Sequence, residues 1–336
     1  MAHRALPRGP DGPQGGRPGV VARRRAGRRA GRLRRAVPTS SATPTPLHYA
    51  LLSPPGAPRG RVALLHGLLV GNLAAWYLSS APALAAAGYE VLMLDLRGHG
   101  RSAPAPAGYD LPTLAGDLAA LLDEVGWGAG PVALAGHSYG ALVALEWALR
   151  HPGRAAAVLA LDPPLRAGDL AALRLAPPPA PPPPAAPPEA LLALLPAPLR
   201  AALGASLSAA QSAAQSAAAQ SAAQPAAGRR LRRALEGWRA LLADTTLLAD
   251  LARPTPLTGE RLRGLRAPLT VLYGERSPCR PAPGEESALR AAPRYAERVI
   301  EGAGHYLLNE AAGAVTAHAL AALGAAEGGG APDAQG

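Results

Sequence analysis

A single serine stands between two glycines in the segment "LAGHSYGAL", residues 134–142, where Gly136, Ser138 and Gly140 form the pattern G-x-S-x-G. An apolar run of strand length precedes this pattern and a helix-like run follows it. A sharp strand-to-helix turn presents a serine hydroxyl at the carboxyl edge of a sheet, at the positive end of a helix. Because glycine has no side chain, neighbouring elements can approach such a turn closely. The pattern therefore predicts a serine nucleophile, which needs a base to take its proton.

Of the eight histidines, His305 is the best placed to be that base. It lies in "EGAGHYLLNE", after the last predicted strand, and therefore at the same sheet edge as Ser138. Catalytic groups gather at this edge in open α/β sheets. His137, next to the serine, is expected to face elsewhere. The remaining histidines lie in turns, in helices or before the predicted sheet: His3, His48, His66, His99, His151 and His318.

Attack on a carbonyl also requires donors for the oxyanion that forms. The segment "HGLLVGN", residues 66–72, follows the first core strand, so the backbone N–H of Leu68 can point toward the site. The N–H of Tyr139, directly after the predicted nucleophile, supplies a second donor. We expect these two backbone groups, rather than their side chains, to hold the oxyanion.

The elements that must position these groups follow from alternating apolar patterns. Strand-length runs occupy residues 61–67, 89–98, 131–136, 154–164, 267–275 and 294–305. Helical patterns fall between or after them, at residues 73–88, 111–126, 141–153 and 311–323. Such alternation predicts an α/β fold, with a mostly parallel, doubly wound sheet covered by helices on both faces.

Charge and composition divide the chain. Of the formal net charge of +11, residues 1–35 carry +10, from 11 Arg and Asp11, so the remainder offers no basic groove for nucleic acid. Residues 1–45 are predicted to be a disordered Arg-rich arm. This arm resembles an organelle transit peptide, which would place the protein in a plastid or mitochondrion. The alternative is a solvated tail on a cytoplasmic protein.

The expected domain organisation has a core at residues 46–164 and 267–325, interrupted by an insertion at 165–266. The insertion combines foldable helical segments with a Pro-rich stretch and an Ala/Gln/Ser-rich stretch, and we interpret it as a helical cap. Residues 326–336 are predicted to be a disordered tail. The sequence contains no uninterrupted apolar run of about 18 residues, so it predicts no membrane span. The oligomeric state cannot be read from these patterns.

The landmarks together resemble the α/β-hydrolase family. They are "HG" (66–67), "DLRGHGRS" (95–102), "GHSYG" (136–140) and "GAGH" (302–305), in the family's order and spacing over roughly residues 47–164 and 267–325. The resemblance implies a serine hydrolase that needs no cofactor or metal. Family members with an aspartate nucleophile, such as dehalogenases and epoxide hydrolases, differ at the position that Ser138 occupies.

The chain departs from this family at the acid that orients the histidine. The family usually places it after the penultimate strand as G-x-x-D, but here the letters are "GERS" and Ser277 holds that position. Serine cannot balance an imidazolium charge. Asp162, at the end of the strand after the nucleophile helix, is a position that some members use; Glu275 is closer to the usual site but two residues early. We favour Asp162 and keep Glu275 as the alternative acid.

These residues predict cleavage of a carboxylic ester or related acyl substrate through an acyl-enzyme. Carbon–carbon bond hydrolysis on the same scaffold is an alternative, as is a non-catalytic binding protein with a hydrolase fold. The chain has one cysteine, Cys279, so it forms no internal disulfide. Without a second cysteine or a histidine cluster nearby in the sequence, Cys279 is expected to be a poor zinc ligand.

Overall fold

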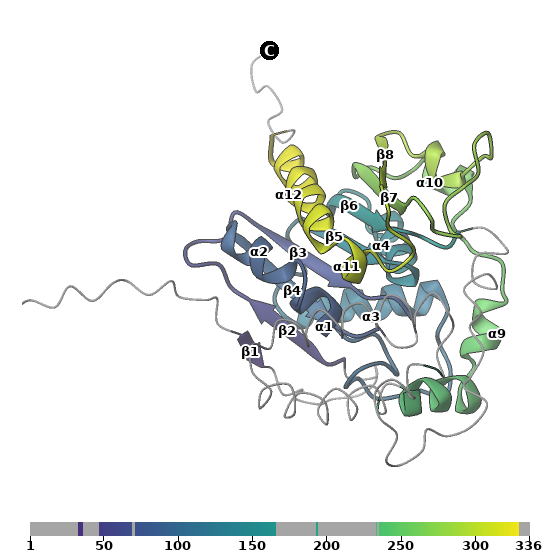
Figure 1. Ribbon diagram of the computed structural model, residues 1–336. Helices are drawn as coiled ribbons and strands as arrows, with labels where there is room; N and C mark the ends of the chain where they lie inside the picture. Colours follow the sequence, from purple (N-terminus) through teal and green to yellow (C-terminus); the bar gives the residue numbers. More distant parts are fainter. Residues whose placement is uncertain are drawn as a thin grey trace, which may run out of the picture.

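The computed structural model describes residues 33–35, 47–68, 71–165 and 235–328, together with the single positions 193 and 233. Its centre is one eight-stranded sheet in the order β1-β2-β4-β3-β5-β6-β7-β8 (Figure 1). Strands β3 to β8 pair in parallel, whereas β2 pairs antiparallel with β4 and β1 pairs antiparallel with β2. The mostly parallel sheet that the sequence predicts is thus confirmed. The strands are Leu33–Arg35, Tyr49–Leu52, Gly60–Leu65, Tyr89–Leu94, Val132–His137, Ala155–Leu161, Leu269–Gly274 and Tyr295–Ile300.

Helices cover both faces of this sheet. One apolar cluster joins the sheet to α3 (Leu111–Glu124) and α4 (Tyr139–Arg150). A second cluster, on the other face, joins it to α2 (Ala81–Ala86) and α12 (Ala312–Gly328). Every residue of β5 is buried, as expected for a central parallel strand with helices on both sides. Shorter labelled helices among the described residues are α1 (Ala74–Tyr77), α9 (Leu247–Leu251), α10 (Gly259–Leu262), η1 (a 3-10 helix, Ala288–Ala291) and α11 (Leu307–Glu310).

The helical pattern at 73–88 forms two helices rather than one. Helix α1 ends at Tyr77 and α2 begins at Ala81, with Pro82 in the first turn of α2. Proline inside one continuous helix would remove a backbone hydrogen bond and clash with the preceding turn, whereas it fits the first turn of a new helix. The break therefore follows from Pro82.

Three residues of the predicted N-terminal arm form the edge strand β1, Leu33–Arg35, which pairs with residues 50–52 of β2. The sequence predicts disorder for residues 1–45, and this prediction is wrong for Leu33–Arg35 because they pair with β2. Without β1, the outer side of β2 would present unpaired backbone N–H and C=O groups, which any extended segment can satisfy. The rest of the arm lies outside the described residues, and its targeting role stays a prediction.

Part of the predicted insertion is described. Residues 235–244 are helical, and they bury Leu235, Trp238 and Leu241. The chain then contacts the loop between β4 and α3: Thr246 N–H donates to the Pro106 carbonyl (2.9 Å) and Tyr109 N–H donates to the carboxylate of Asp250 (3.0 Å). These contacts dock the end of the insertion on the core. Whether the insertion caps the site stays a prediction, because most of it lies outside the described residues.

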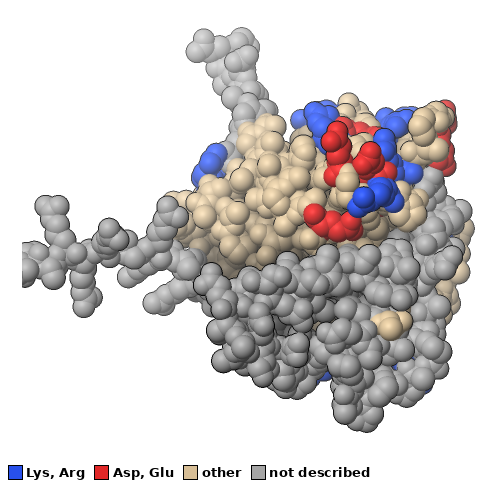
Figure 2. Space-filling model, in the orientation of Figure 1, with Lys and Arg blue, Asp and Glu red and all other residues tan. Residues whose placement is uncertain are grey.

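Charged side chains on the face shown in Figure 2 are concentrated around the region that Figure 1 labels β8, where acidic and basic residues are interspersed. The pair Arg290–Glu297, at 3.2 Å, is an example from this region. Among the described residues that are coloured on this face, acidic and basic side chains are mixed rather than separated by sign. Among the described residues, no helix is both long and apolar enough to cross a bilayer.

Candidate active site

Ser138 occupies a strained turn between β5 and α4. Its φ of 54° and ψ of −125° lie outside the regions that non-glycine residues favour. The turn is tight on both sides. A Cβ on Gly136 would lie 2.3 Å from the Gly140 carbonyl oxygen, and a Cβ on Gly140 would lie 2.4 Å from the His66 carbonyl oxygen. Only glycine fits at these two positions, which explains the G-x-S-x-G pattern physically.

His305 lies in the loop between β8 and α11 and reaches the serine. Its Nε2 is 3.0 Å from the Ser138 Oγ. The neighbouring His137 has another partner, because its Nε2–H donates to the His305 carbonyl at 2.7 Å. His137 therefore fixes the backbone of the residue that contacts the serine.

Asp162 follows β6 and adopts a left-handed φ of 48°. Its Oδ2 lies 2.5 Å from the His305 Nδ1, and its Oδ1 accepts the Gly274 N–H at 3.1 Å. The hydroxyl of Ser277 donates to the same Oδ2. Asp162 is fully buried, and these contacts compensate for the burial of its charge.

Glu275, the alternative acid, faces a different environment. It is exposed, and its Oε2 accepts the Gly302 N–H at 2.8 Å. The structure thus brings together Ser138, His305 and Asp162, and places Glu275 in a surface turn.

The loop carrying Leu68 lies directly against the serine. A Cβ on Gly67 would lie 3.1 Å from the Ser138 Cβ, so the absence of a side chain permits the contact. The His66 ring holds this loop, because its Nδ1–H donates to the Gly67 carbonyl (2.6 Å) while its Nε2 accepts the Leu96 N–H (2.9 Å). Tyr139 is the first residue of α4, where helix geometry leaves the N–H without an intrahelical acceptor. Leu68 follows Gly67, which approaches Ser138, and Tyr139 directly follows Ser138 in the chain. The orientation of their N–H groups stays a prediction.

Three buried histidines near the site act as fixed hydrogen-bonding groups. Burial lowers the pKa of His137 and of His99 to about 3, assisted by the repulsion of a neighbouring histidine in each case. Burial also lowers the pKa of His66, against the attraction of Asp95. These rings are therefore neutral at pH 7, which is what the acceptor role of His66 toward Leu96 requires.

The residues of "DLRGHGRS" shape the loop after β4. Arg97 forms a two-pronged ion pair with Asp117 of α3, with Nε–Oδ2 at 2.7 Å and Nη2–Oδ1 at 2.6 Å. Asp95 accepts the Leu73 N–H (2.7 Å) and faces the His48 Nδ1 (2.7 Å). These contacts join neighbouring loops and give the motif a structural role.

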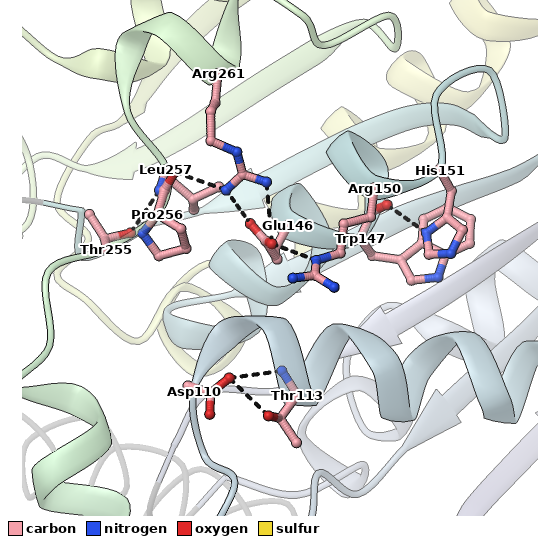
Figure 3. A network of polar contacts seen from close by, with 10 residues as sticks. All are labelled: Asp110, Thr113, Glu146, Trp147, Arg150, His151, Thr255, Pro256, Leu257 and Arg261. Atoms are coloured by element: carbon pink, nitrogen blue, oxygen red, sulfur yellow. Dashed lines mark hydrogen bonds and ion pairs between the residues drawn. The ribbon is translucent and has the colours of Figure 1, made fainter.

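Helix α4, which follows the serine, is anchored by a buried carboxylate (Figure 3). Glu146 is 0% exposed and pairs with Arg150 (2.7 Å) and with Arg261 of α10 (2.8 Å). Burial by itself would raise the pKa of Glu146, but the hydrogen bonds and charges of Arg261 and Arg150 outweigh it and lower this pKa. The anchor thus connects the end of the insertion with the helix whose first turn adjoins Ser138.

Sequence reasoning missed two residues in the loop after β7. Ser277 contacts Asp162, and the Cys279 Sγ lies 3.6 Å from the His305 Nδ1. The sequence predicts that Cys279 is a poor zinc ligand, since it has neither a second cysteine nor a histidine cluster nearby. The fold brings one histidine, His305, from 26 positions along the chain, and Asp162 also lies close to this sulfur. The match of Ser277 to the usual acid position could have indicated that this loop reaches the histidine.

Comparisons with known proteins identify the family of this chain. A family model described as "Alpha/beta hydrolase family" matches residues 62–319. Epoxide hydrolase B of Mycobacterium tuberculosis is 38% identical over 124 residues, which are 36% of this chain and 33% of that protein. Lipase LipV of the same organism is 36% identical over 121 residues, which are 35% of this chain and 41% of that protein. The matches thus span well under half the length of these relatives.

A solved structure shows the same fold over a larger part of the chain. The structure of a thermophilic esterase from Thermogutta terrifontis aligns with a TM-score of 0.60 at 22% identity, covering 88% of this chain and 99% of that one. At this identity the likeness shows the fold alone.

Proposed function

Since this chain belongs to the alpha/beta hydrolase family of enzymes, we propose that it is a serine hydrolase that cleaves a carboxylic ester or a related acyl substrate. One observation carries the proposal. Ser138 Oγ lies 3.0 Å from His305 Nε2, and His305 Nδ1 lies 2.5 Å from Asp162 Oδ2. The nucleophile therefore lies within hydrogen-bonding distance of the base, and the base lies within hydrogen-bonding distance of the acid that orients it, as nucleophilic catalysis requires.

In the first half of the reaction, Ser138 Oγ attacks the carbonyl carbon while His305 Nε2 takes the hydroxyl proton. Asp162 holds the Nδ1–H of His305, which keeps Nε2 free of a proton before attack and stabilises the imidazolium afterwards. The N–H groups of Leu68 and Tyr139 then hold the oxyanion. Transfer of the proton from Nε2 to the leaving alcohol gives an acyl-enzyme on Ser138.

In the second half, a water molecule repeats the attack on the acyl-enzyme. His305 takes a proton from this water, and the ester bond to Ser138 breaks with return of the proton to the serine. No cofactor takes part in any of these steps. The donors at Asp162, from Gly274 and Ser277, keep the carboxylate fixed throughout.

Epoxide hydrolysis, the activity in the name of one relative, does not suit a serine nucleophile. A serine alkoxide that opens an epoxide forms an ether, which has no carbonyl for water to attack, so the enzyme would not turn over. An ester, by contrast, leaves an acyl group that water removes. The chemistry of Ser138 therefore favours acyl substrates.

Labelling by a fluorophosphonate tests the proposal. Folded wild-type protein should react covalently at one residue, and Ser138→Ala should not react. The same pair of proteins should differ in the hydrolysis of p-nitrophenyl esters over a series of acyl chain lengths. A folded wild type that neither reacts nor hydrolyses any ester would contradict the proposal and favour a binding protein. Cleavage of a diketone without ester cleavage would favour carbon–carbon bond hydrolysis.

A further inference from the structure

A thiol, an imidazole and a carboxylate converge on the side of His305 that faces away from Ser138. Cys279 Sγ lies 3.6 Å from His305 Nδ1, and Asp162 Oδ2 lies 2.5 Å from the same nitrogen. The ligand atoms of these three buried residues all lie within 4.8 Å of one another. Sulfur, nitrogen and oxygen donors of these kinds are those that Zn²⁺ binds in proteins. We propose that Asp162, Cys279 and His305 form an inhibitory site for Zn²⁺ or another thiophilic divalent cation.

The distances define two arrangements that exclude each other. Zinc bond lengths of about 2.0–2.3 Å in a tetrahedral site place pairs of ligand atoms roughly 3.3–3.6 Å apart. The separation of Cys279 Sγ and His305 Nδ1, 3.6 Å, already meets this requirement. The 2.5 Å between Nδ1 and Asp162 Oδ2 is a direct hydrogen bond, too short to hold an ion. A cation therefore has to replace that hydrogen bond, so it acts as an inhibitor of the hydrogen-bonded site.

The position of one proton explains why the bound cation would stop the reaction. A metal on Nδ1 requires this nitrogen to be unprotonated, so the neutral ring carries its proton on Nε2 instead. The thiol proton of Cys279 is released to solvent, because the thiolate is the ligand. Nε2 faces Ser138 Oγ at 3.0 Å and can no longer accept the hydroxyl proton. Inhibition rests on the proposed function, whereas binding of the cation does not.

Cadmium binding to the full chain tests the site without any measurement of activity. Cys279 is the only cysteine of the 336 residues, so a cadmium–thiolate absorption band reports this residue alone. The band should saturate at one equivalent in wild type and in Ser138→Ala, and should be absent in Cys279→Ser. His305→Gln should weaken cadmium binding by at least about 10-fold. His48→Gln is the matched control, since His48 also faces an aspartate at 2.7 Å, and it should bind cadmium like wild type.

Zinc inhibition of ester hydrolysis is the second measurement. After incubation with zinc, the wild type should lose activity and regain it on addition of EDTA. In Cys279→Ser, compared with its own zinc-free rate, half-inhibition should require at least about 10-fold more zinc. Equal zinc sensitivity in both proteins, or a cadmium band in His305→Gln at wild-type affinity, would overturn the proposal. If the wild type hydrolyses no ester, the cadmium titration still decides the site, so failure of the function and failure of the site are distinguishable.

Discussion

At the scale of single residues, the Asp162 carboxylate makes three of the polar contacts of the candidate site. It accepts hydrogen bonds from the Gly274 N–H and the Ser277 hydroxyl while it faces His305. Asp162 comes from the end of β6, and Ser277 comes from the loop after β7, at the place where the family resemblance puts the acid. A carboxylate from one strand and a hydroxyl from the next therefore meet beside one imidazole.

Removing the charge of Asp162 tests its proposed role. Asp162→Asn should lower kcat by a factor on the order of 10⁴, because the amide favours the wrong tautomer of His305 and cannot balance the imidazolium. Glu275→Gln should retain wild-type kcat, since the exposed Glu275 carboxylate accepts the Gly302 N–H in a surface turn. Steady-state kinetics of the two variants, with circular dichroism to verify folding, decide between them. Loss of activity in Glu275→Gln with an active Asp162→Asn would refute the assignment.

The hydroxyl of Ser277 should affect turnover through Asp162. Ser277→Val removes the donor to Oδ2 and the acceptor for the Cys279 N–H, which lies 3.1 Å away. Loss of a hydrogen bond to a charged group costs about 1.5–3 kcal/mol, so kcat should fall by roughly 10–100-fold with little change in KM. Threonine has the same shape as valine but keeps the hydroxyl, so Ser277→Thr should retain most of the wild-type rate. If Thr and Val variants behave alike, the hydroxyl is not what positions Asp162.

How far the site can be predicted from sequence differs among its residues. Ser138 and His305 stand out because a local rule places both after strands at the same sheet edge, and the structure places them 3.0 Å apart. The choice between Asp162 and Glu275 depends on backbone direction at two strand ends, which the sequence does not encode locally. The contact of Ser277 with Asp162 joins residues 115 positions apart, so no periodicity reveals it.

At the scale of elements, strands are easier to predict than their neighbours in the sheet. Apolar runs ending in glycine or aspartate are local signals, and each predicted run contains most of one of the strands β3 to β8. The runs at 89–98 and 294–305 extend past the strand ends at Leu94 and Ile300. The order β2-β4-β3-β5 depends on pairing between distant segments, which no local pattern contains. The pairing of β1 with β2 is of the same kind, since nothing in an Arg-rich segment indicates a strand. Pro82, in contrast, was a readable signal for the break between α1 and α2.

The contact between α4 and α10 should be worth measurable stability. Arg261→Gln removes the guanidinium that pairs with the buried Glu146 carboxylate and leaves Arg150 as its partner. The free energy of unfolding should fall by about 1.5–3 kcal/mol, the usual range for a hydrogen bond to a charged group. Arg263→Gln, at the exposed C-cap of α10, is the matched control and should change it by less than about 0.5 kcal/mol. Urea unfolding of both variants measures the difference, and equal stabilities would show that the pair contributes nothing.

At the scale of the whole molecule, three neutral histidines hold the loops at the carboxyl edge of the sheet, two of them by joining separate segments and His99 within its own loop. His66 joins the loops after β3 and β4, His137 joins the end of β5 to the loop after β8, and His99 donates to the Arg97 carbonyl at 2.9 Å. In the unfolded chain each of these rings takes a proton near pH 6.5. In the folded protein burial lowers the pKa of His99 and His137 to about 3 and lowers that of His66 as well. The unfolded state therefore binds more protons than the folded state between these values.

This difference predicts acid sensitivity in a defined window. Stability is complete above the unfolded pKa of about 6.5 and falls as the pH decreases toward 3, by up to about 1.4 kcal/mol per pH unit for each histidine. Between about pH 7.5 and pH 5, His99 and His137 together should lower the free energy of unfolding by roughly 4 kcal/mol. Glu146 affects the free energy of unfolding at lower pH. Its pKa is depressed in the folded protein, so its contribution to stability is lost only as the pH falls through that lowered value.

Urea midpoints across this pH range measure how steeply stability falls. His99→Asn, which can still donate to the Arg97 carbonyl, should reduce this slope by the share of one histidine. A flat profile down to pH 5 would mean that these rings accept protons in the folded state, and a neutral His66 would then no longer explain how the Leu68 loop is held against Ser138.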